Sequence, residues 1–159
     1  MKIIYNKICL KSIQTKMAGI FLAQKIIFTN LYKRKKNIIL IQGSMGIGKT
    51  IFVKGFAQKL GILRINSPSF NFFKIYNFNN NKLFHMDLFR FENNSKLVFL
   101  LEEVFEYLST GDILLIESTY LNNEIEKLCD FKIEIKFLKC NSRLITIEQK
   151  KLQINKKRL

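Results

Sequence analysis

Residues 43–50 read Gly43-Ser44-Met45-Gly46-Ile47-Gly48-Lys49-Thr50, and this stretch decides the fold class. It matches the pattern G-x-x-x-x-G-K-[ST], in which glycines let successive backbone N–H groups turn inward around an anion. An uninterrupted apolar run, 38–41, precedes the loop, and residues 49–60 have the apolar spacing of a helix. Strand, glycine-rich loop and helix together predict a phosphate-binding loop, to which the helix N-terminus adds its partial positive charge.

The residue types of this loop predict the binding of a nucleoside triphosphate. Lys49 would reach the β- and γ-phosphates, and the hydroxyl of Thr50 would ligate Mg²⁺. A carboxylate at the end of a neighbouring buried strand should hold the same ion. Asp87 and Glu117 both qualify, because each ends a short apolar run. One could bind the metal while the other orients the attacking water, and periodicity does not decide between them.

Other polar residues near these positions have two readings each. His85 lies two residues before Asp87, so strand alternation puts both on one side, where His85 is either packed or a hydrogen-bonding partner. A serine of Ser67-Pro68-Ser69 could sense a γ-phosphate or simply form a turn. Arg90 and Arg143, two of the five arginines, could neutralise developing phosphate charge or be ordinary surface cations.

The pattern along the chain alternates helices and strands. We expect a strand over 3–10, a helix capped by Ser12 or Thr15 and ending near 28, a hairpin of 70–76 and 83–87, a helix to about 108, a strand over 113–116 and an antiparallel pair, 131–137 and 144–147. In the first helix, residues recur near helical spacing at Ile13, Met17, Ile20, Phe21, Gln24 and Ile27. The predicted fold class is α/β, with strands of a parallel sheet buried on both faces and a C-terminal antiparallel strand pair. Residues 1–159 should form a single domain with a basic tail from about 150.

Composition bounds the class of protein. The chain has 159 residues, 48% of them apolar, with 27 Lys+Arg against 12 Asp+Glu and a formal net charge of +15. Length and apolar fraction fit a folded domain and exclude a wholly disordered chain. The charge makes a polyanionic partner a hypothesis. However, Lys outnumbers Arg 22 to 5 and Asn, Ile and Phe are abundant. Because phosphate-binding faces usually favour Arg, we slightly favour a bias toward A/T-rich codons as the cause.

Cysteine usage and hydropathy indicate the compartment. Cys9, Cys129 and Cys140 have no recurrent spacing, which argues against a disulfide framework, and a single His argues against a Cys/His zinc site. No apolar run reaches the roughly 18 residues needed to span a bilayer. Lysines interrupt any signal-peptide core at the N-terminus. We therefore expect a soluble, cytoplasmic protein that does not bind a membrane.

Four motifs in this order resemble one family. The loop at 43–50, then Ser67-Pro68-Ser69-Phe70, then His85-Met86-Asp87-Leu88-Phe89-Arg90, then Leu114-Leu115-Ile116-Glu117 are similar to the TsaE (formerly YjeE) pattern of G-D-L-G-A-G-K-T, S-P-T-[YF], H-x-D-[LVI]-Y-R and [VI]-E-W. Thr15, Gly19 and Ala23 also fit the family's spacing before the loop. The resemblance covers about residues 12–148, and the third block at this distance is its specific part.

The resemblance implies a P-loop NTPase-like three-layer fold with a mixed, mainly parallel central sheet. It also implies a small ATPase of bacterial tRNA threonylcarbamoyladenosine synthesis. Such a protein binds ATP and Mg²⁺ and hydrolyses ATP slowly, which supports multiple turnovers by the TsaB–TsaD pair. The tRNA would be reached indirectly, through that complex, and DNA is not an expected partner. The basic stretches 33–36 and 150–158 could help to recruit the tRNA.

The family's roles transfer by position. Lys49 and the amides of residues 43–50 would hold the phosphates, Thr50 and Glu117 would ligate Mg²⁺, and Asp87 would orient or deprotonate water. Ser69 would take the place of the family's switch threonine. The resemblance also puts the region from Ser12 to Thr15 near the adenine and Arg143 near the nucleotide.

The sequence departs from the family pattern at five positions. Ser44 replaces an acidic residue, Ile47 a small one, Ser69 a threonine, Phe89 a tyrosine and Ser118 a tryptophan. The loss of a large aromatic at Ser118 puts nucleotide-linked conformational coupling in question. Because Lys49, Thr50, Asp87 and Glu117 all remain, ATP binding and hydrolysis should persist.

Two other functions compete with this interpretation. A small-molecule P-loop kinase would need an acceptor site and an arginine-rich lid, whereas arginine is scarce here and no lid-like insertion follows the loop. A non-catalytic RNA-binding module would use the basic surface but would leave the phosphate loop and both strand-end acids unexplained.

Overall fold

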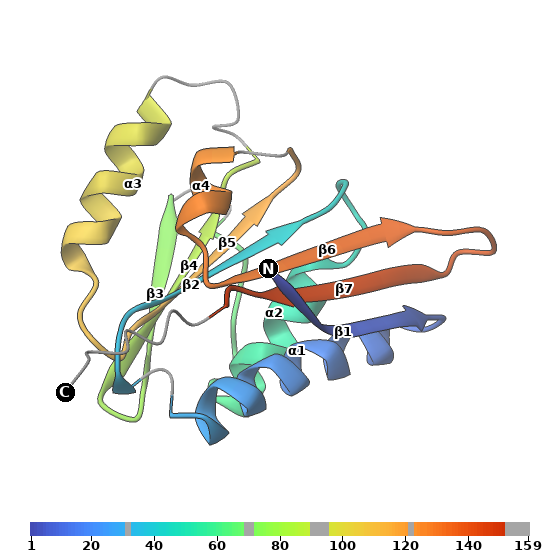
Figure 1. Cartoon of the computed structure of the whole chain (residues 1–159), viewed down its shortest axis with the longest axis horizontal. Coiled ribbons are helices and arrows are strands. Elements are labelled where there is room, and N and C mark those ends of the chain that lie inside the picture. Colours follow the sequence, from blue (N-terminus) through green and yellow to red (C-terminus); the bar gives the residue numbers. More distant parts are fainter. Residues whose placement is uncertain (31–32, 69–71, 90–95, 121–122, 152–159) are drawn as a thin grey trace, which may run out of the picture.

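A seven-stranded sheet with helices on both faces forms the molecule (Figure 1). The computed structural model describes residues 1–30, 33–68, 72–89, 96–120 and 123–151. Its elements are β1 (Lys2–Cys9), α1 (Ser12–Phe28), β2 (Asn37–Gln42), α2 (Lys49–Lys59), β3 (Phe73–Phe78), β4 (Asn81–Asp87), α3 (Lys96–Tyr107), β5 (Ile113–Ser118), α4 (Asn123–Leu128), β6 (Phe131–Phe137) and β7 (Arg143–Gln149). The strands lie in the order β1-β7-β6-β2-β5-β4-β3.

The directions of the strands determine where the loops meet. The four central strands, β6, β2, β5 and β4, run parallel, whereas β7 is antiparallel to β6 and β3 to β4. β1 pairs antiparallel with β7 and therefore shares the direction of the centre. The carboxyl ends of β2, β4 and β5 consequently meet at one edge. The predicted fold class is confirmed: three layers, a mixed and mainly parallel sheet, and a C-terminal antiparallel pair.

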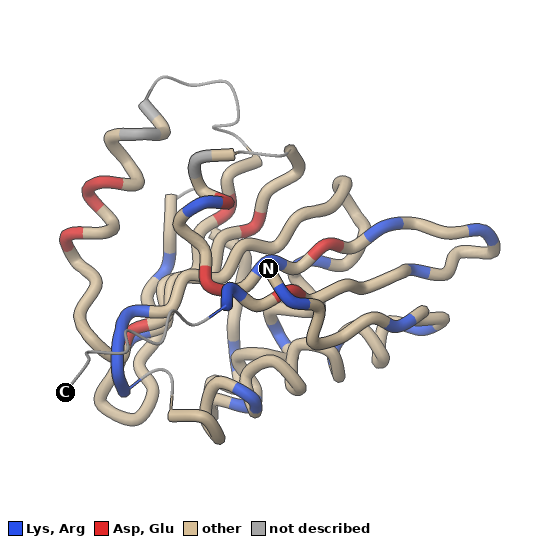
Figure 2. The backbone as a smooth tube through the Cα atoms, in the orientation of Figure 1, with Lys and Arg blue, Asp and Glu red and all other residues tan. Residues whose placement is uncertain are grey.

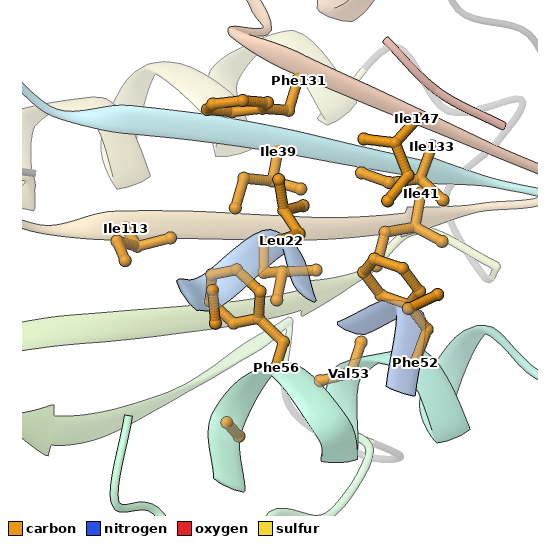
Figure 3. Packing of buried hydrophobic residues seen from close by; sticks show 14 of the residues in the cluster. Leu22, Ile39, Ile41, Phe52, Val53, Phe56, Ile113, Phe131, Ile133 and Ile147 are labelled. Carbon is orange, nitrogen blue, oxygen red and sulfur yellow. The ribbon is translucent and has the colours of Figure 1, made fainter. Parts of the chain in front are cut away.

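Two apolar clusters hold the layers together, one on each face of the sheet. Ile39 and Ile41 of β2 point toward α1 and α2, where Figure 3 shows Phe52 and Phe56 packing beneath them. The alternate residue Leu40 belongs to the cluster under α3 and α4. Strands buried on both faces read as continuous apolar runs, which is why the sequence made β2 and β5 recognisable. Each fully buried side chain of this size contributes about 1.5–3 kcal/mol.

Helix α1 buries a different face from the one that its large apolar residues predict. Ile13 and Met17 are 55% and 59% exposed, and Phe21 is 37% exposed. The buried residues are instead Thr15, Ala18, Gly19, Leu22, Ala23 and Ile26. The small residues are buried because α1 packs directly against α2, and close packing of two helices needs small residues where they cross.

Two glycines make this close crossing possible. A Cβ atom placed on Gly19 would collide with the backbone carbonyl of Phe52, and one placed on Gly55 would collide with that of Lys16. Both obstacles are backbone atoms of the facing helix, so neither can rotate away. The crossing fixes α1 next to the helix that follows the glycine-rich loop.

The start of α1 also differs from the expectation. Lys11 is the N-cap and Ser12 is the first helical residue, so neither Ser12 nor Thr15 caps the helix. The side chain of Gln14 performs the capping, because its Oε1 accepts hydrogen bonds from the backbone N–H groups of Leu10 (2.6 Å) and Lys11 (3.0 Å). Free amides at a helix N-terminus need such an acceptor.

The β3–β4 hairpin extends further into the asparagine-rich segment than expected. Its turn lies at Asn79 and Asn80, whose φ angles of 43° and 64° are left-handed. Asparagine tolerates this conformation better than most residues, and two consecutive left-handed residues match the twist of a two-residue hairpin. The strands therefore pair up to the ends of the turn, with Phe78 opposite Asn81.

All three cysteines are free, as their spacing indicated. Cys9 and Cys129 are buried and Cys140 is exposed. Burial is the main cause that raises the pKa of the Cys129 thiol to about 11, so it stays protonated at neutral pH.

Within the described residues, no helix is both long enough and apolar enough to cross a membrane.

The substitution Gly55→Ala should destabilise the protein by about 1–3 kcal/mol, because the added methyl group overpacks the α1–α2 crossing. Urea unfolding followed by circular dichroism measures the effect. Gln58→Ala, at an exposed position of the same helix, is the matched control and should change stability by less than about 0.5 kcal/mol. A gain of about 1 kcal/mol for Gly55→Ala, as helix propensity alone gives, would contradict the crossing geometry.

Candidate functional site

The sheet brings the glycine-rich loop and the two strand-end acids to the same edge. β5 lies between β2 and β4, and Glu117 is in register with Ile41 on one side and with Asp87 on the other. Neighbouring residues in parallel register project to the same face. This face is the one that α2 covers, so both carboxylates lie on the side of the first turn of α2.

The loop between β2 and α2 has the geometry of a phosphate-binding loop. Gly48 has a φ of 111°, a left-handed value that favours glycine directly before the helix. A Cβ atom on Gly43 would meet the carbonyl oxygen of Ile135 at 2.7 Å, so only glycine fits where the loop leaves the sheet. The Lys49 ammonium group donates hydrogen bonds to the carbonyl oxygens of Gly43 (2.5 Å) and Ser44 (3.2 Å). Lys49 therefore lies folded across the loop.

Glu117 joins three elements through a buried carboxylate. Its Oε2 accepts a hydrogen bond from Thr50 Oγ1 (3.1 Å), and its Oε1 lies 2.7 Å from His85 Nε2. Glu117 and His85 are 1% and 0% exposed. Of the two readings for His85, the structure selects the hydrogen-bonding partner. Charge-assisted bonds of this kind fix the orientation of a carboxylate.

Asp87 is held separately from Glu117. Its Oδ2 accepts a hydrogen bond from Ser67 Oγ (3.2 Å), and its Oδ1 accepts one from the backbone N–H of Phe89 (3.1 Å). Ser67 is a residue that we did not single out as a site residue, although it belongs to the Ser67-Pro68-Ser69 motif. Ser69 itself and Arg90 lie outside the described residues.

A cavity of about 330 Å³ joins these groups. It is lined by Met45, Gly46, Gly48, Lys49, Thr50, Ile51, Asp87, Phe89, Glu117 and Thr119. Met45 and Phe89 are 72% and 50% exposed, so they offer apolar surface at the rim. Ile51 of α2 and Thr119, directly after β5, also line the cavity and were not predicted.

Thr15 and Arg143 support the loop from outside this cavity. The Thr15 side chain is fully buried and lies against Gly48. The Arg143 guanidinium donates a hydrogen bond from Nε to the carbonyl oxygen of Ile47 (2.8 Å) and lies over the ring of Phe137. Ile47 is itself 1% exposed, because its side chain enters the core. The contacts of these residues are thus with the backbone or underside of the loop.

The donor set at the cavity fits a hard cation. Among the described residues, no group of three or more His, Cys, Asp or Glu side chains forms a metal-binding cluster. The cavity instead offers a hydroxyl, Thr50, next to a carboxylate, Glu117, both with oxygen donors. Mg²⁺ prefers oxygen ligands and is usually held by one or two protein groups together with substrate phosphates. The site fits Mg²⁺ bound with a nucleotide and does not resemble an all-protein metal cage.

Comparison with known proteins identifies relatives of this chain. The family model "Threonylcarbamoyl adenosine biosynthesis protein TsaE" matches residues 13–145. A Bacillus subtilis protein named "tRNA threonylcarbamoyladenosine biosynthesis protein TsaE" is 38% identical over 97 residues, which cover 60% of this chain and 59% of the relative. The Aquifex aeolicus protein of the same name is 32% identical over 116 residues, which cover 71% and 77%. The match to the Bacillus subtilis protein thus spans about three fifths of that relative's length.

A solved structure agrees with the sequence relatives. The crystal structure of Bacillus subtilis YdiB superposes with a TM-score of 0.66 at 26% sequence identity, over 94% of this chain and 88% of that chain. The family model covers the glycine-rich loop, both strand-end acids and Arg143. On the evidence of the matched family model, the similar sequences and the shared fold, this chain belongs to the TsaE family.

Proposed function

We propose that this protein binds ATP with Mg²⁺ at the glycine-rich loop and hydrolyses it as the ATPase component of tRNA threonylcarbamoyladenosine biosynthesis. The observation that carries the proposal is the contact of Thr50 with Glu117 in the cavity that also holds Lys49 and Asp87. These four residues are the loop lysine, the metal-binding hydroxyl and the acids that phosphoryl transfer from a nucleotide requires. The names of the relatives support the pathway.

Binding relies on the loop and Lys49. The loop N–H groups and the N-terminus of α2 form an anion site for the phosphates. Lys49 would exchange its bonds to the Gly43 and Ser44 carbonyls for bonds to the β- and γ-phosphates. Thr50 and Glu117 would hold Mg²⁺, which supplies charge neutralisation on the phosphates when it is bound. His85 is a positioning residue, because it fixes the oxygen of Glu117 that Thr50 does not contact.

Hydrolysis needs a group that orients the attacking water, and the structure favours Asp87 for this role. Glu117 is already engaged with the metal-binding hydroxyl of Thr50, whereas Asp87 contacts neither Thr50 nor His85 among the interactions described. Ser67 and the amide of Phe89 hold the Asp87 carboxylate in place at the edge of the cavity. A fixed carboxylate in this position can accept a hydrogen bond from water and direct it toward a γ-phosphate.

The pathway points to partners and a compartment. We propose that the ATPase acts with the TsaB–TsaD pair, that tRNA is modified by that complex, and that the protein is cytoplasmic. The relatives' names support a place in tRNA modification. A small-molecule kinase remains the contrasting function, and it would turn over ATP with an acceptor and without protein partners.

Lys49→Ala should lower the affinity for ATP by about 13- to 160-fold, since a hydrogen bond to a charged group contributes about 1.5–3 kcal/mol. Isothermal titration calorimetry in the presence of Mg²⁺ measures the loss. Lys59→Ala is the matched control, because Lys59 lies exposed in the last turn of the same helix. ATP affinity should be unchanged in the control. Equal affinity in both variants would show that the phosphates bind elsewhere.

Asp87→Asn and Glu117→Gln should separate the two acids. Asp87→Asn should lower ATP turnover by about 10²- to 10⁴-fold with little change in nucleotide affinity, because it removes the group that orients water. Glu117→Gln should raise the Mg²⁺ concentration required for ATP binding, because it weakens a metal ligand. Phosphate release and Mg²⁺ titration of nucleotide binding measure the two effects. Glu103→Gln, on the exposed surface of α3, controls for the loss of one charge. If Asp87→Asn instead raised the Mg²⁺ requirement and Glu117→Gln lowered turnover, Asp87 would be the metal ligand and Glu117 the residue that orients water.

ATP turnover should rise when purified TsaB and TsaD are added, and the complete mixture should modify tRNA. The rate of phosphate release is compared for the protein alone, with the pair, and with the pair and tRNA. Lys49→Ala, which should remove ATP turnover in all three mixtures, is the control for contaminating ATPases. If the rate of ATP turnover did not change when TsaB and TsaD were added, and instead required a small-molecule acceptor, the result would favour the kinase function.

A further inference from the structure

The net positive charge of the chain arises from one part of the sequence. Residues 1–86 contain 15 Lys and Arg and no Asp or Glu, whereas residues 87–159 contain 12 of each sign. The entire net charge of +15 therefore arises before Asp87. A codon bias that favours lysine raises the basic count in both parts but does not remove acids from only one. The absence of Asp and Glu from residues 1–86 therefore needs a cause other than codon bias.

In the fold, this separation places the charges on different layers. Helices α1 and α2 both belong to the acid-free part of the chain and cover the same face of the sheet. Helix α3, on the opposite face, carries Glu102, Glu103 and Glu106. Figure 2 shows the resulting contrast, with red segments along α3 and only blue ones along α1 and α2. The exposed sides of α1 and α2 thus carry no carboxylates.

A hollow of about 430 Å³ lies on this layer. It is lined by Lys16, Lys54, Gln58, Leu63, Arg64, Ile65 and Asn66, which come from α1, α2 and the segment after α2. The three cations are at least partly exposed, and in the described part of the chain their side chains take part in none of the hydrogen bonds or ion pairs. Unpaired like charges around one hollow repel each other, and an anion would relieve that repulsion.

The hollow is separate from the nucleotide cavity. The two share no lining residue. Lys54 follows Lys49 by five residues, which places it about 7.5 Å further along the helix axis and on another side of α2. A variant of the hollow can therefore be tested while the nucleotide loop stays intact.

We propose that the α1–α2 face, through Lys16, Lys54 and Arg64, binds the phosphodiester backbone of RNA. A surface with no acid at all matches a uniformly charged backbone, whereas a specific protein partner is usually recognised by charges of both signs. Two of the three cations are lysines, which act on phosphates as point charges without demanding a fixed fork geometry. The choice of tRNA as the RNA rests on the proposed function.

The test compares two triple variants of the full chain. Lys16→Ala, Lys54→Ala and Arg64→Ala are combined in the basic-face variant. Lys127→Ala, Lys139→Ala and Lys151→Ala are combined in the control, which removes the same charge from exposed lysines outside that face. Binding of fluorescently labelled tRNA is measured at 50 and 200 mM KCl. ATP affinity and the melting temperature are measured in parallel and should match the wild type in both variants.

The salt dependence distinguishes the outcomes. Each lost phosphate contact lowers the slope of log K against log [salt] by about 0.7–0.9, so wild-type affinity should fall about 20- to 40-fold more than that of the basic-face variant between the two salt concentrations. The control should keep most of the wild-type salt dependence. An equal loss in both variants would assign binding to net charge and overturn the proposal.

Two further results would also overturn it. One is the absence of tRNA binding by the wild type. The other is a basic-face variant that keeps tRNA affinity but loses binding to TsaB–TsaD, because the face would then recognise an acidic protein surface. Neither result bears on ATP turnover at the nucleotide cavity, so failure of this inference can be told apart from failure of the proposed function.

Discussion

The buried carboxylate of Glu117 is the constraint on which the site depends. Its two oxygens contact Thr50 at the start of α2 and His85 in the middle of β4, so one side chain connects a helix and two strands. A buried charge without such partners would cost several kcal/mol. The parallel register that aligns β2, β5 and β4 is what allows both contacts at once. The same register brings Asp87 to the edge of the cavity.

The crossing of α1 and α2 places α1 against the glycine-rich loop at 43–50. Because Gly19 and Gly55 let the two helices approach closely, Thr15 reaches the underside of Gly48. Arg143 reaches the same loop from β7 and binds the Ile47 carbonyl. The first helix and the last strand thus brace a loop that lies between them in sequence. Such support from distant segments fixes the backbone of the loop when the chain folds.

Much of this arrangement could be predicted from the sequence, and the failures share a cause. The apolar runs of β2 and β5 and the loop at 43–50 are local patterns, so they located the strands, the fold class and the acids. The helical spacing of Ile13, Met17 and Phe21 does not mark the buried face of α1, because the crossing with α2 buries small residues such as Gly19 instead. The bond from Ser67 to Asp87 depends on two segments 20 residues apart, and no local pattern encodes it.

The net charge of the chain likewise says less than the positions of the charged residues in the fold. A total of +15 is compatible with codon bias, and the sequence alone favoured that explanation slightly. Once the chain is folded, the acid-free part supplies the whole α1–α2 layer, and the segment after α2 contributes Arg64 to the hollow and Ser67 to Asp87. A few residues therefore separate the basic face from the acid that would orient water. The hollow and the nucleotide cavity thus draw on one short stretch of chain, through Arg64 and Ser67, even though they share no lining residue.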